Sequence, residues 1–357
     1  MSNELGVPKS QFLFADYVRV LATLAVIALH SSGELLNNYS EVAKNDWWIG
    51  NIINSSLRWS VPLFVMLSGA LLLEGKKEGN RNFLKKRAGR VLIPYLFWSC
   101  IYVIYVYRYD FRDGLPLKYD EIWYKLAFND GHYHLWFVSM ILGLYLLTPT
   151  LRILCANGTR KDLEYFITVW FFSVTICTYY PKFFVIKFMG WMAYVGLFVA
   201  GHYLKKYGFK FQKYLYAAGW IAFFITPLGT YYLTNRKGEF DGQFQTYLAP
   251  NILACSFALF LYLKNYDWQN LEANFPRVAR FIHRFASMSF GVYLLHALIL
   301  DILKNGYFGF TIYNNNILGV PTNPCYAVPI LTTFVTVIST IIIALLYKIP
   351  HAKKLVG

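Results

Sequence analysis

Long apolar runs separated by short polar loops dominate the chain. Ten of these runs approach the roughly 20 residues that a helix needs to cross a bilayer. The loops between them are too short to hold a separate soluble domain. The pattern therefore predicts an all-α fold, a polytopic transmembrane bundle of about ten helices, in which residues 1–357 form a single transmembrane domain with no fused soluble domain. The ten runs lie at 13–31, 49–73, 91–108, 135–151, 164–180, 184–204, 213–234, 246–264, 287–303 and 328–348.

The first run also has the length of the apolar region of a signal peptide. Asp16 and Arg19 lie inside the run, near its start, and no A-x-A-like cleavage site follows His30. A signal peptide carries its charge before the apolar region and small residues after it. We therefore expect an uncleaved first helix.

Composition agrees with the bilayer as the solvent for most side chains. Apolar residues make up 57% of the 357 residues, aromatic residues 19% and charged residues only 15%. Soluble domains are about 25% charged. Disordered chains contain few aromatic residues. A soluble enzyme and a disordered protein are both excluded.

The net charge of +15 is explained by topology. With the N-terminus placed in the cytoplasm, 22 Lys and Arg residues fall in cytoplasmic segments and 10 in external ones. This asymmetry is what the positive-inside rule expects. It predicts that both termini are cytoplasmic, and no nucleic-acid partner is needed to explain the charge.

The first predicted span carries three ionisable side chains, each costing roughly 2.5–3.5 kcal/mol at the centre of a membrane helix. Arg19 and His30 are eleven residues apart, so they share one helix face about 16 Å apart. Asp16 and Arg19 are i,i+3 neighbours and can pair. The alternatives are that Asp16 and Arg19 are interfacial anchors and that His30 is a hydrogen-bonded core histidine.

The second predicted span carries Arg58 about 13 Å from its external end, close to the middle of the bilayer. A guanidinium there needs an anionic or carbonyl partner. Pro62 removes one helical hydrogen bond and can kink the span. The alternative is a structural arginine satisfied by neighbouring helices.

The loop before the third span contains Arg87 and Arg90, three residues apart. On one side of a helix start, the two guanidinium groups can hold a polyphosphate through charge-assisted bonds. A basic loop is also what the topology requires, so the charge alone does not distinguish the two interpretations.

Three histidines are expected in the external third of the membrane: His30, His134 and His296. No His/Glu helical pair has metal-ligand spacing, and His132-x-His134 alone is a weak signal, so we predict no metal site. Proton transfer suits these residues better, because imidazole titrates near neutral pH and can accept a hydroxyl proton. Each one can equally be a buried structural histidine.

Taken together, these residues resemble the acyltransferase-3 family of bacterial integral membrane O-acyltransferases. The resemblance covers predicted spans one to four and nine. The stretches 54–62 and 134–137 are similar, more narrowly, to the O-acetyltransferases of the enterobacterial common antigen. The matching pieces are Asp16-x-x-Arg19 followed by His30, Pro62-Leu63-Phe64 with Ser68-Gly69, Arg87-x-x-Arg90 with Pro94, His134-Leu135-Trp136-Phe137 and Ser289-Phe290-Gly291-Val292-Tyr293-Leu294-Leu295-His296.

The resemblance implies an O-acyltransferase in the bacterial cytoplasmic (inner) membrane. Such an enzyme moves an acyl group, acetyl in the narrower group, from cytoplasmic acyl-CoA to a hydroxyl of a cell-surface or lipid-linked glycan. Acyl-CoA, in particular acetyl-CoA, would be a co-substrate, and no permanently bound cofactor is implied. Some relatives carry a fused periplasmic domain, so this chain would transfer directly or pass the acyl group to a separate periplasmic partner.

The resemblance also assigns residue roles. Arg87 and Arg90 would hold the CoA phosphates, and Arg19, with Asp16 as its partner, would lie beside the pantetheine arm. His30 would be the general base on the acceptor hydroxyl. The i,i+4 spacing, rather than the resemblance, suggests Glu34, one turn later, as its orienter. The acceptor or the tetrahedral oxyanion would be bound by further residues. These are Arg58, His134, Trp136, Tyr293 and His296.

Two other classes place charged residues in a membrane bundle. One is a multi-span transporter, although the chain shows no paired halves with interrupted helices. The other is a membrane sensor that binds acyl-CoA without turnover. Release of the CoA thiol in the presence of acceptor would distinguish an enzyme from both.

Overall fold

The computed structural model describes residues 9–74, 79–114, 119–128, 131–180, 190–304, 310–311, 316–317 and 320–357. Apart from three two-residue antiparallel strands in the order β1-β2-β3, the described fold is all-helical. The strands are β1 (Phe310–Thr311), β2 (Asn316–Ile317) and β3 (Val320–Pro321). The helices are α1 (Lys9–Asn37), α2 (Lys44–Leu57), α3 (Ser60–Leu72), α4 (Asn80–Arg87), the π-helix η1 (Ala88–Leu92), α5 (Ile93–Val106), α6 (Arg108–Arg112), α7 (Tyr119–Phe128), α8 (Trp136–Asn157), α9 (Arg160–Tyr179), the 3-10 helix η2 (Gly190–Tyr194), α10 (Val195–Tyr207), α11 (Gln212–Lys237), the 3-10 helix η3 (Gln243–Gln245), α12 (Pro250–Asn265), α13 (Trp268–Asn274), α14 (Pro276–Ile302), α15 (Pro324–Leu346) and α16 (Lys353–Val356).

Seven helical segments within the described ranges are long and apolar enough to cross a membrane, so the protein is a multi-pass membrane protein. Each overlaps a predicted span, and the third and sixth segments begin eleven residues before the span predicted for them. The seven segments are Leu13–Asn37, Lys44–Leu72, Asn80–Val106, Trp136–Asn157, Gln243–Asn265, Pro276–Ile302 and Pro324–Leu346.

The other three predicted spans contain α9, α10 and α11, which fall short of the same apolar length. Four of the first five residues of α9 are charged, and α10 has 13 residues. Tyr, Thr, Gly and Pro interrupt the apolar residues of α11. Residues 184–189, at the start of the sixth predicted span, lie outside the described ranges. The count of ten crossings therefore stays a prediction.

Two contacts fix the direction of α14 relative to α1. Asp16 contacts His283, and 14 residues later on α1 His30 contacts His296. The two contacts are about 20 Å apart on each helix, so the helices run parallel. If the seven segments crossed alternately, α14 would be the sixth and antiparallel to α1. An odd number of further crossings must lie between them.

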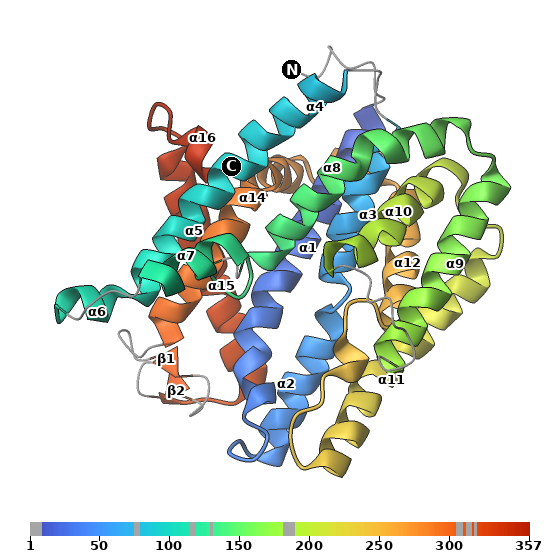
Figure 1. Cartoon of the computed structure of the whole chain (residues 1–357). Helices are drawn as coiled ribbons and strands as arrows, with labels where there is room; N and C mark the ends of the chain where they lie inside the picture. Colours follow the sequence, from blue (N-terminus) through green and yellow to red (C-terminus); the bar gives the residue numbers. More distant parts are fainter. Residues whose placement is uncertain are drawn as a thin grey trace.

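α9, α10 and α11 are placed to supply these crossings, since in Figure 1 they run alternately down, up and down between α8 and α12. The same view places α16 and the start of α1 at one end of the bundle, as an even number of crossings requires. The assignment of that end to the cytoplasm still rests on the charge pattern.

The second span is interrupted at Arg58 and Trp59, between α2 and α3. Pro62 lies in the first turn of α3, where its missing N–H costs little because that N–H has no intrahelical acceptor. The interruption lets the Arg58 side chain leave the helix surface toward residues of another segment.

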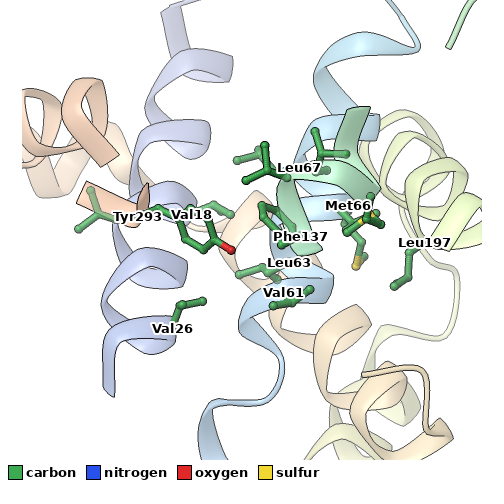
Figure 2. Close-up of a cluster of buried hydrophobic side chains, with 14 of the residues drawn as sticks. Val18, Val26, Val61, Leu63, Met66, Leu67, Phe137, Leu197 and Tyr293 are labelled. Carbon is green, nitrogen blue, oxygen red and sulfur yellow. The ribbon is translucent and has the colours of Figure 1, made fainter. Parts of the chain in front are cut away.

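An apolar layer fills the centre of the bundle (Figure 2). It joins α1, α3, α8, α10 and α14, and it separates the polar side chains near Asp16 from those near His30. Labelled members are Val18, Val26, Val61, Leu63, Met66, Leu67, Phe137, Leu197 and Tyr293.

α3 and α10 cross in backbone contact. A Cβ at Gly69 would lie 1.7 Å from the Phe198 carbonyl oxygen, and one at Gly201 would lie 1.9 Å from the Met66 carbonyl oxygen. Small residues at helix crossings allow this approach in membrane proteins. The short α10 therefore depends on two glycines for its place beside α3.

Gly201→Ala should destabilise the bundle by about 3 kcal/mol or more, because the new methyl group meets backbone that a rotamer change cannot move. The measurement is the midpoint of thermal unfolding in detergent, followed by size-exclusion chromatography. Gly33→Ala is the matched control, since no atom lies within 4 Å of a Cβ there. Equal midpoints for the two variants would contradict the backbone contact.

Candidate active site

Two histidines from α1 and α14 meet at the end of the bundle that contains the start of α8. His30 Nδ1 lies 2.9 Å from His296 Nε2. The rings are nearly parallel, with 11° between their planes and 5.1 Å between centroids. His296 is fully buried, whereas His30 is partly exposed. Of the two residues, His30 is therefore the one nearer the surface of the bundle.

The hydrogen bonds of His296 determine the tautomer of His30. His296 Nδ1 faces the backbone carbonyl oxygen of Tyr293, which can only accept a hydrogen bond. In a neutral His296, Nδ1 therefore carries the proton and Nε2 is the acceptor. His30 must then donate from Nδ1, which leaves its Nε2 unprotonated. A partly exposed imidazole held this way has the arrangement of a general base.

His134 completes the predicted group of three histidines. Its ring is edge-on to that of His296, with centroids 5.1 Å apart, and it is buried. The Tyr293 hydroxyl donates to the His134 carbonyl oxygen, and His134 Nε2 lies 3.3 Å from the Leu294 carbonyl oxygen. The structure thus brings together His30, His134, His296 and Tyr293.

Glu34 lies beside the same cluster but contacts a different group. Its carboxylate is 3.2 Å from Lys304 Nζ, and Lys304 Nζ is also 3.3 Å from the His30 carbonyl oxygen. The orienting contact expected between Glu34 and the His30 ring is made instead by His296. His296 is predicted to lie in the same third of the membrane as His30, but its contact with the His30 ring could not be found from spacing, because the two residues are 266 positions apart. Lys304 was not predicted, and it is 274 positions from His30.

Arg58 is held by neighbouring side chains. Its Nε donates to Asn54 Oδ1 at 2.8 Å, and its Nη2 donates to Gln245 Oε1 at 2.9 Å. The guanidinium carbon lies 5.6 Å from the ring centroid of Tyr247, and Trp136 stacks on the same ring at 5.7 Å. Of the expected anionic or carbonyl partners, both are carbonyl oxygens of side-chain amides. Arg58 and Trp136 thus share an aromatic corner next to the histidines.

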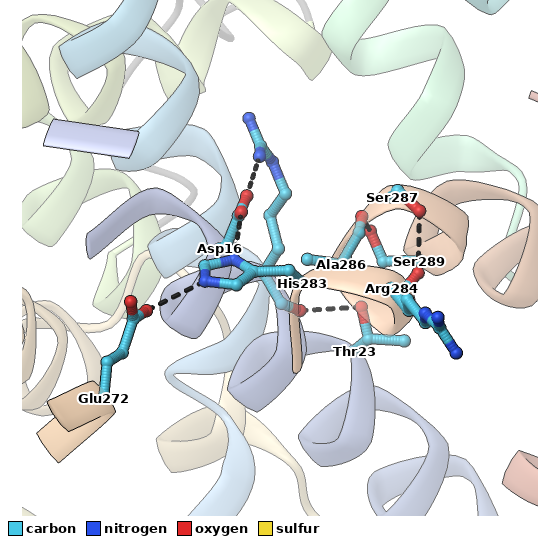
Figure 3. Close-up of polar contacts among 9 residues, drawn as sticks. Asp16, Thr23, Glu272, His283, Arg284, Ala286, Ser287 and Ser289 are labelled. Atoms are coloured by element: carbon cyan, nitrogen blue, oxygen red, sulfur yellow. Dashed lines mark hydrogen bonds and ion pairs between the residues drawn. The ribbon is translucent and has the colours of Figure 1, made fainter. Parts of the chain in front are cut away.

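A second polar cluster lies at the opposite end of α1 (Figure 3). Asp16 accepts from Arg19 Nη1 at 2.7 Å, so the expected pair is present, and it also contacts His283 Nδ1 at 2.9 Å. His283 Nε2 lies 2.8 Å from Glu272 Oε1. Both ring nitrogens face carboxylates, so both are donors and His283 is positively charged. Sequence reasoning missed His283 and Glu272, since they come from a different helix pair.

Arg87 and Arg90 occupy different environments. The Arg87 guanidinium lies over the rings of Phe83 and Tyr145, at 5.5 and 5.8 Å. Its Nε is buried and has no hydrogen-bond partner among the described residues. Arg90 is exposed on η1. In Figure 1, α4, which ends at Arg87, and the start of α1 lie at the same end of the bundle.

No group of three or more His, Cys, Asp or Glu residues in the described part of the chain is arranged to hold a metal ion. The chemistry that the geometry supports is proton transfer at His30 and anion binding near Arg87.

Asp16→Ala should lower the free energy of unfolding by about 1–3 kcal/mol, because Arg19 and His283 both lose a charged acceptor. Thermal unfolding in detergent measures this effect. Asp120→Ala, at an exposed position on α7, is the control for loss of a carboxylate. If the two variants unfold at the same temperature, the cluster does not stabilise the fold.

Comparisons with known proteins identify the class. A family model described as an acyltransferase domain matches residues 12–348. The putative membrane-bound acyltransferase YfiQ of Bacillus subtilis is 22% identical over 306 residues, 80% of each chain. The succinoglycan biosynthesis protein ExoH of Rhizobium meliloti is 28% identical over 170 residues, 42% of this chain and 44% of that protein. No solved structure matches the chain.

These matches favour an enzyme over the transporter and sensor alternatives. The family model spans nearly the whole described bundle, including both polar clusters. The chain belongs to the acyltransferase-3 family and is a multi-pass membrane acyltransferase.

Proposed function

We propose that the protein transfers an acetyl group from acetyl-CoA to a hydroxyl of a cell-surface or lipid-linked glycan at the bacterial inner membrane. The observation that carries the proposal is the contact between Nδ1 of the partly exposed His30 and Nε2 of the buried His296. With both rings neutral, this contact leaves His30 Nε2 unprotonated. The glycan acceptor is supported by the name of the relative ExoH, a succinoglycan biosynthesis protein, and by the narrower resemblance of residues 54–62 and 134–137.

The reaction needs one proton carrier. His30 Nε2 accepts the proton of the acceptor hydroxyl as its oxygen attacks the thioester carbonyl carbon. A C–O bond forms, the C–S bond of acetyl-CoA breaks, and the proton passes from His30 to the departing sulfur. His30 Nδ1 donates to His296 throughout, so the imidazolium form keeps its orientation. The transient oxyanion lies near cations, of which Lys304 and Arg58 are the nearest candidates.

The donor side is proposed at the Asp16 end. The buried Arg87 Nε, the exposed Arg90 and the Arg19–Asp16 pair supply charge-assisted donors for CoA phosphates. The acyl-pantetheine arm would extend from there past the layer that contains Val18 and Val26, toward His30. The acceptor would bind in the aromatic corner of Arg58 and Trp136.

His30→Ala should lower the rate of CoA release at least about 100-fold, the usual contribution of a general base. The assay uses membranes, acetyl-CoA and a crude undecaprenyl-linked glycan fraction, with the thiol measured over time. His351→Ala, at an exposed position far along the chain, controls for loss of an imidazole. A wild-type rate in a correctly eluting His30→Ala protein would refute the assignment.

Changing Arg87 and Arg90 together to Ala should raise the KM for acetyl-CoA about tenfold or more and leave the KM for acceptor unchanged, because two phosphate contacts are lost. The matched control changes Lys85 and Lys86 of α4 to Ala, which removes the same amount of charge from neighbouring positions. If both double variants raise the KM equally, general charge rather than a specific site explains the effect.

A further inference from the structure

A chain of ring nitrogens links α14 to the turn before α8. His134 Nε2 faces the Leu294 carbonyl oxygen at 3.3 Å. His134 Nδ1 faces His132 Nδ1 at 3.1 Å, and His132 Nε2 faces Asp301 Oδ2 at 3.0 Å. The two groups at the ends of this series, the Leu294 carbonyl and the Asp301 carboxylate, both belong to α14. The two histidines therefore form a hydrogen-bonded bridge between two positions on one helix.

This bridge needs one more proton than its neutral rings supply. The Leu294 carbonyl and an ionised Asp301 are both acceptors. Three hydrogen bonds between them require three protons, whereas two neutral imidazoles carry two. All three hydrogen bonds can therefore form only when one extra proton is shared by Asp301, His132 and His134. Without it, a nitrogen lone pair would face the carboxylate or a second lone pair.

The proton can exchange with solvent, because the side chains of His132 and Asp301 are 10% and 25% exposed. Tyr102 of α5 stacks on His132, with centroids 4.4 Å apart, and its hydroxyl donates to the same Leu294 carbonyl oxygen. Other titratable or charged groups face the bridge from every side. Tyr133 in the turn and Tyr293 and His296 on α14 contact the bridge through their rings. His30 on α1 contacts Tyr133 and His296, and the charged groups around His30 and Tyr133 are Glu34, Arg58 and Lys304.

We propose that Asp301 and His132 are positioning residues whose shared proton holds the turn with His134 against α14. The turn in question is residues 131–135, and Tyr293, which donates to the His134 carbonyl oxygen, also supplies the carbonyl that orients His296. Loss of the proton therefore disturbs the contact that orients His30. This inference rests on the proposed function for its kinetic test.

The bridge and His30 together predict that activity passes through a maximum as pH rises. His30 must be unprotonated, so activity rises with pH on the acid side. The bridge must keep its extra proton, so activity falls again as pH rises further. The free energy of unfolding also falls as pH rises on the alkaline side, because a proton bound only in the folded bridge stabilises the protein until it is lost.

Asp301→Asn distinguishes this bridge from an ordinary ion pair. The asparagine amide can donate to His132 Nε2, so two neutral imidazoles then satisfy all three hydrogen bonds. We expect CoA release near the wild-type rate at neutral pH and a descending limb displaced to higher pH. Asp301→Ala removes the partner altogether and should lower kcat about 10- to 100-fold, with the KM for acetyl-CoA unchanged, through misplacement of His30.

The midpoint of thermal unfolding between neutral and alkaline pH gives a readout that does not require activity. It should fall with pH in the wild type and much less in Asp301→Asn. Asp120→Asn, exposed on α7, is the control and should follow the wild type. A wild-type alkaline limb and midpoint in Asp301→Asn would overturn the proposal. So would an Asp301→Asn variant as impaired as Asp301→Ala. If the wild type releases no CoA, the proposed function fails while the unfolding measurement still decides on the bridge.

Discussion

Inside a bilayer a polar side chain has no water to bond, so each one must find its partner within the bundle. In this protein that constraint joins α1 to α14 at two levels. Asp16 contacts His283 at one end, and His30 contacts His296 at the other. These contacts set the two helices parallel, and the parallel direction in turn restricts how the intervening chain can cross the membrane. The topology and the geometry of His30 thus depend on the same interface.

The two polar levels differ in their chemistry. The Asp16 end combines two carboxylates with Arg19, positively charged His283 and the nearby Arg87, which suits binding of an anionic donor. The His30 end is built from imidazoles, whose nitrogens can gain and lose protons near neutral pH. Apolar side chains of α1, α3, α8 and α14 lie between them (Figure 2). This separation is consistent with an enzyme that receives its donor on one side and delivers the acyl group on the other.

Local patterns predicted much of the fold. Apolar length located the helices, and i,i+3 spacing found the Asp16–Arg19 pair. Three of the ten predicted spans do not meet the criterion of apolar length, because α9 and α11 carry charged or small polar residues and α10 is short. Spacing proposed Glu34, one turn away, as the partner of the His30 ring. The ring instead contacts His296, which lies on another helix. His283 likewise could not be found, because its partners come from α1 and α13.

The central claim is that His296 holds His30 in the tautomer with an unprotonated Nε2. Nitrogen NMR of protein labelled at histidine, with His30→Ala used to assign the His30 signals, tests it most directly. The account predicts that, near neutral pH, His30 shows a protonated Nδ1 and an unprotonated Nε2 in the wild type. In His296→Ala this preference should be lost. A wild-type His30 with its proton on Nε2 would contradict the account, since that nitrogen could not then accept the proton of the acceptor hydroxyl.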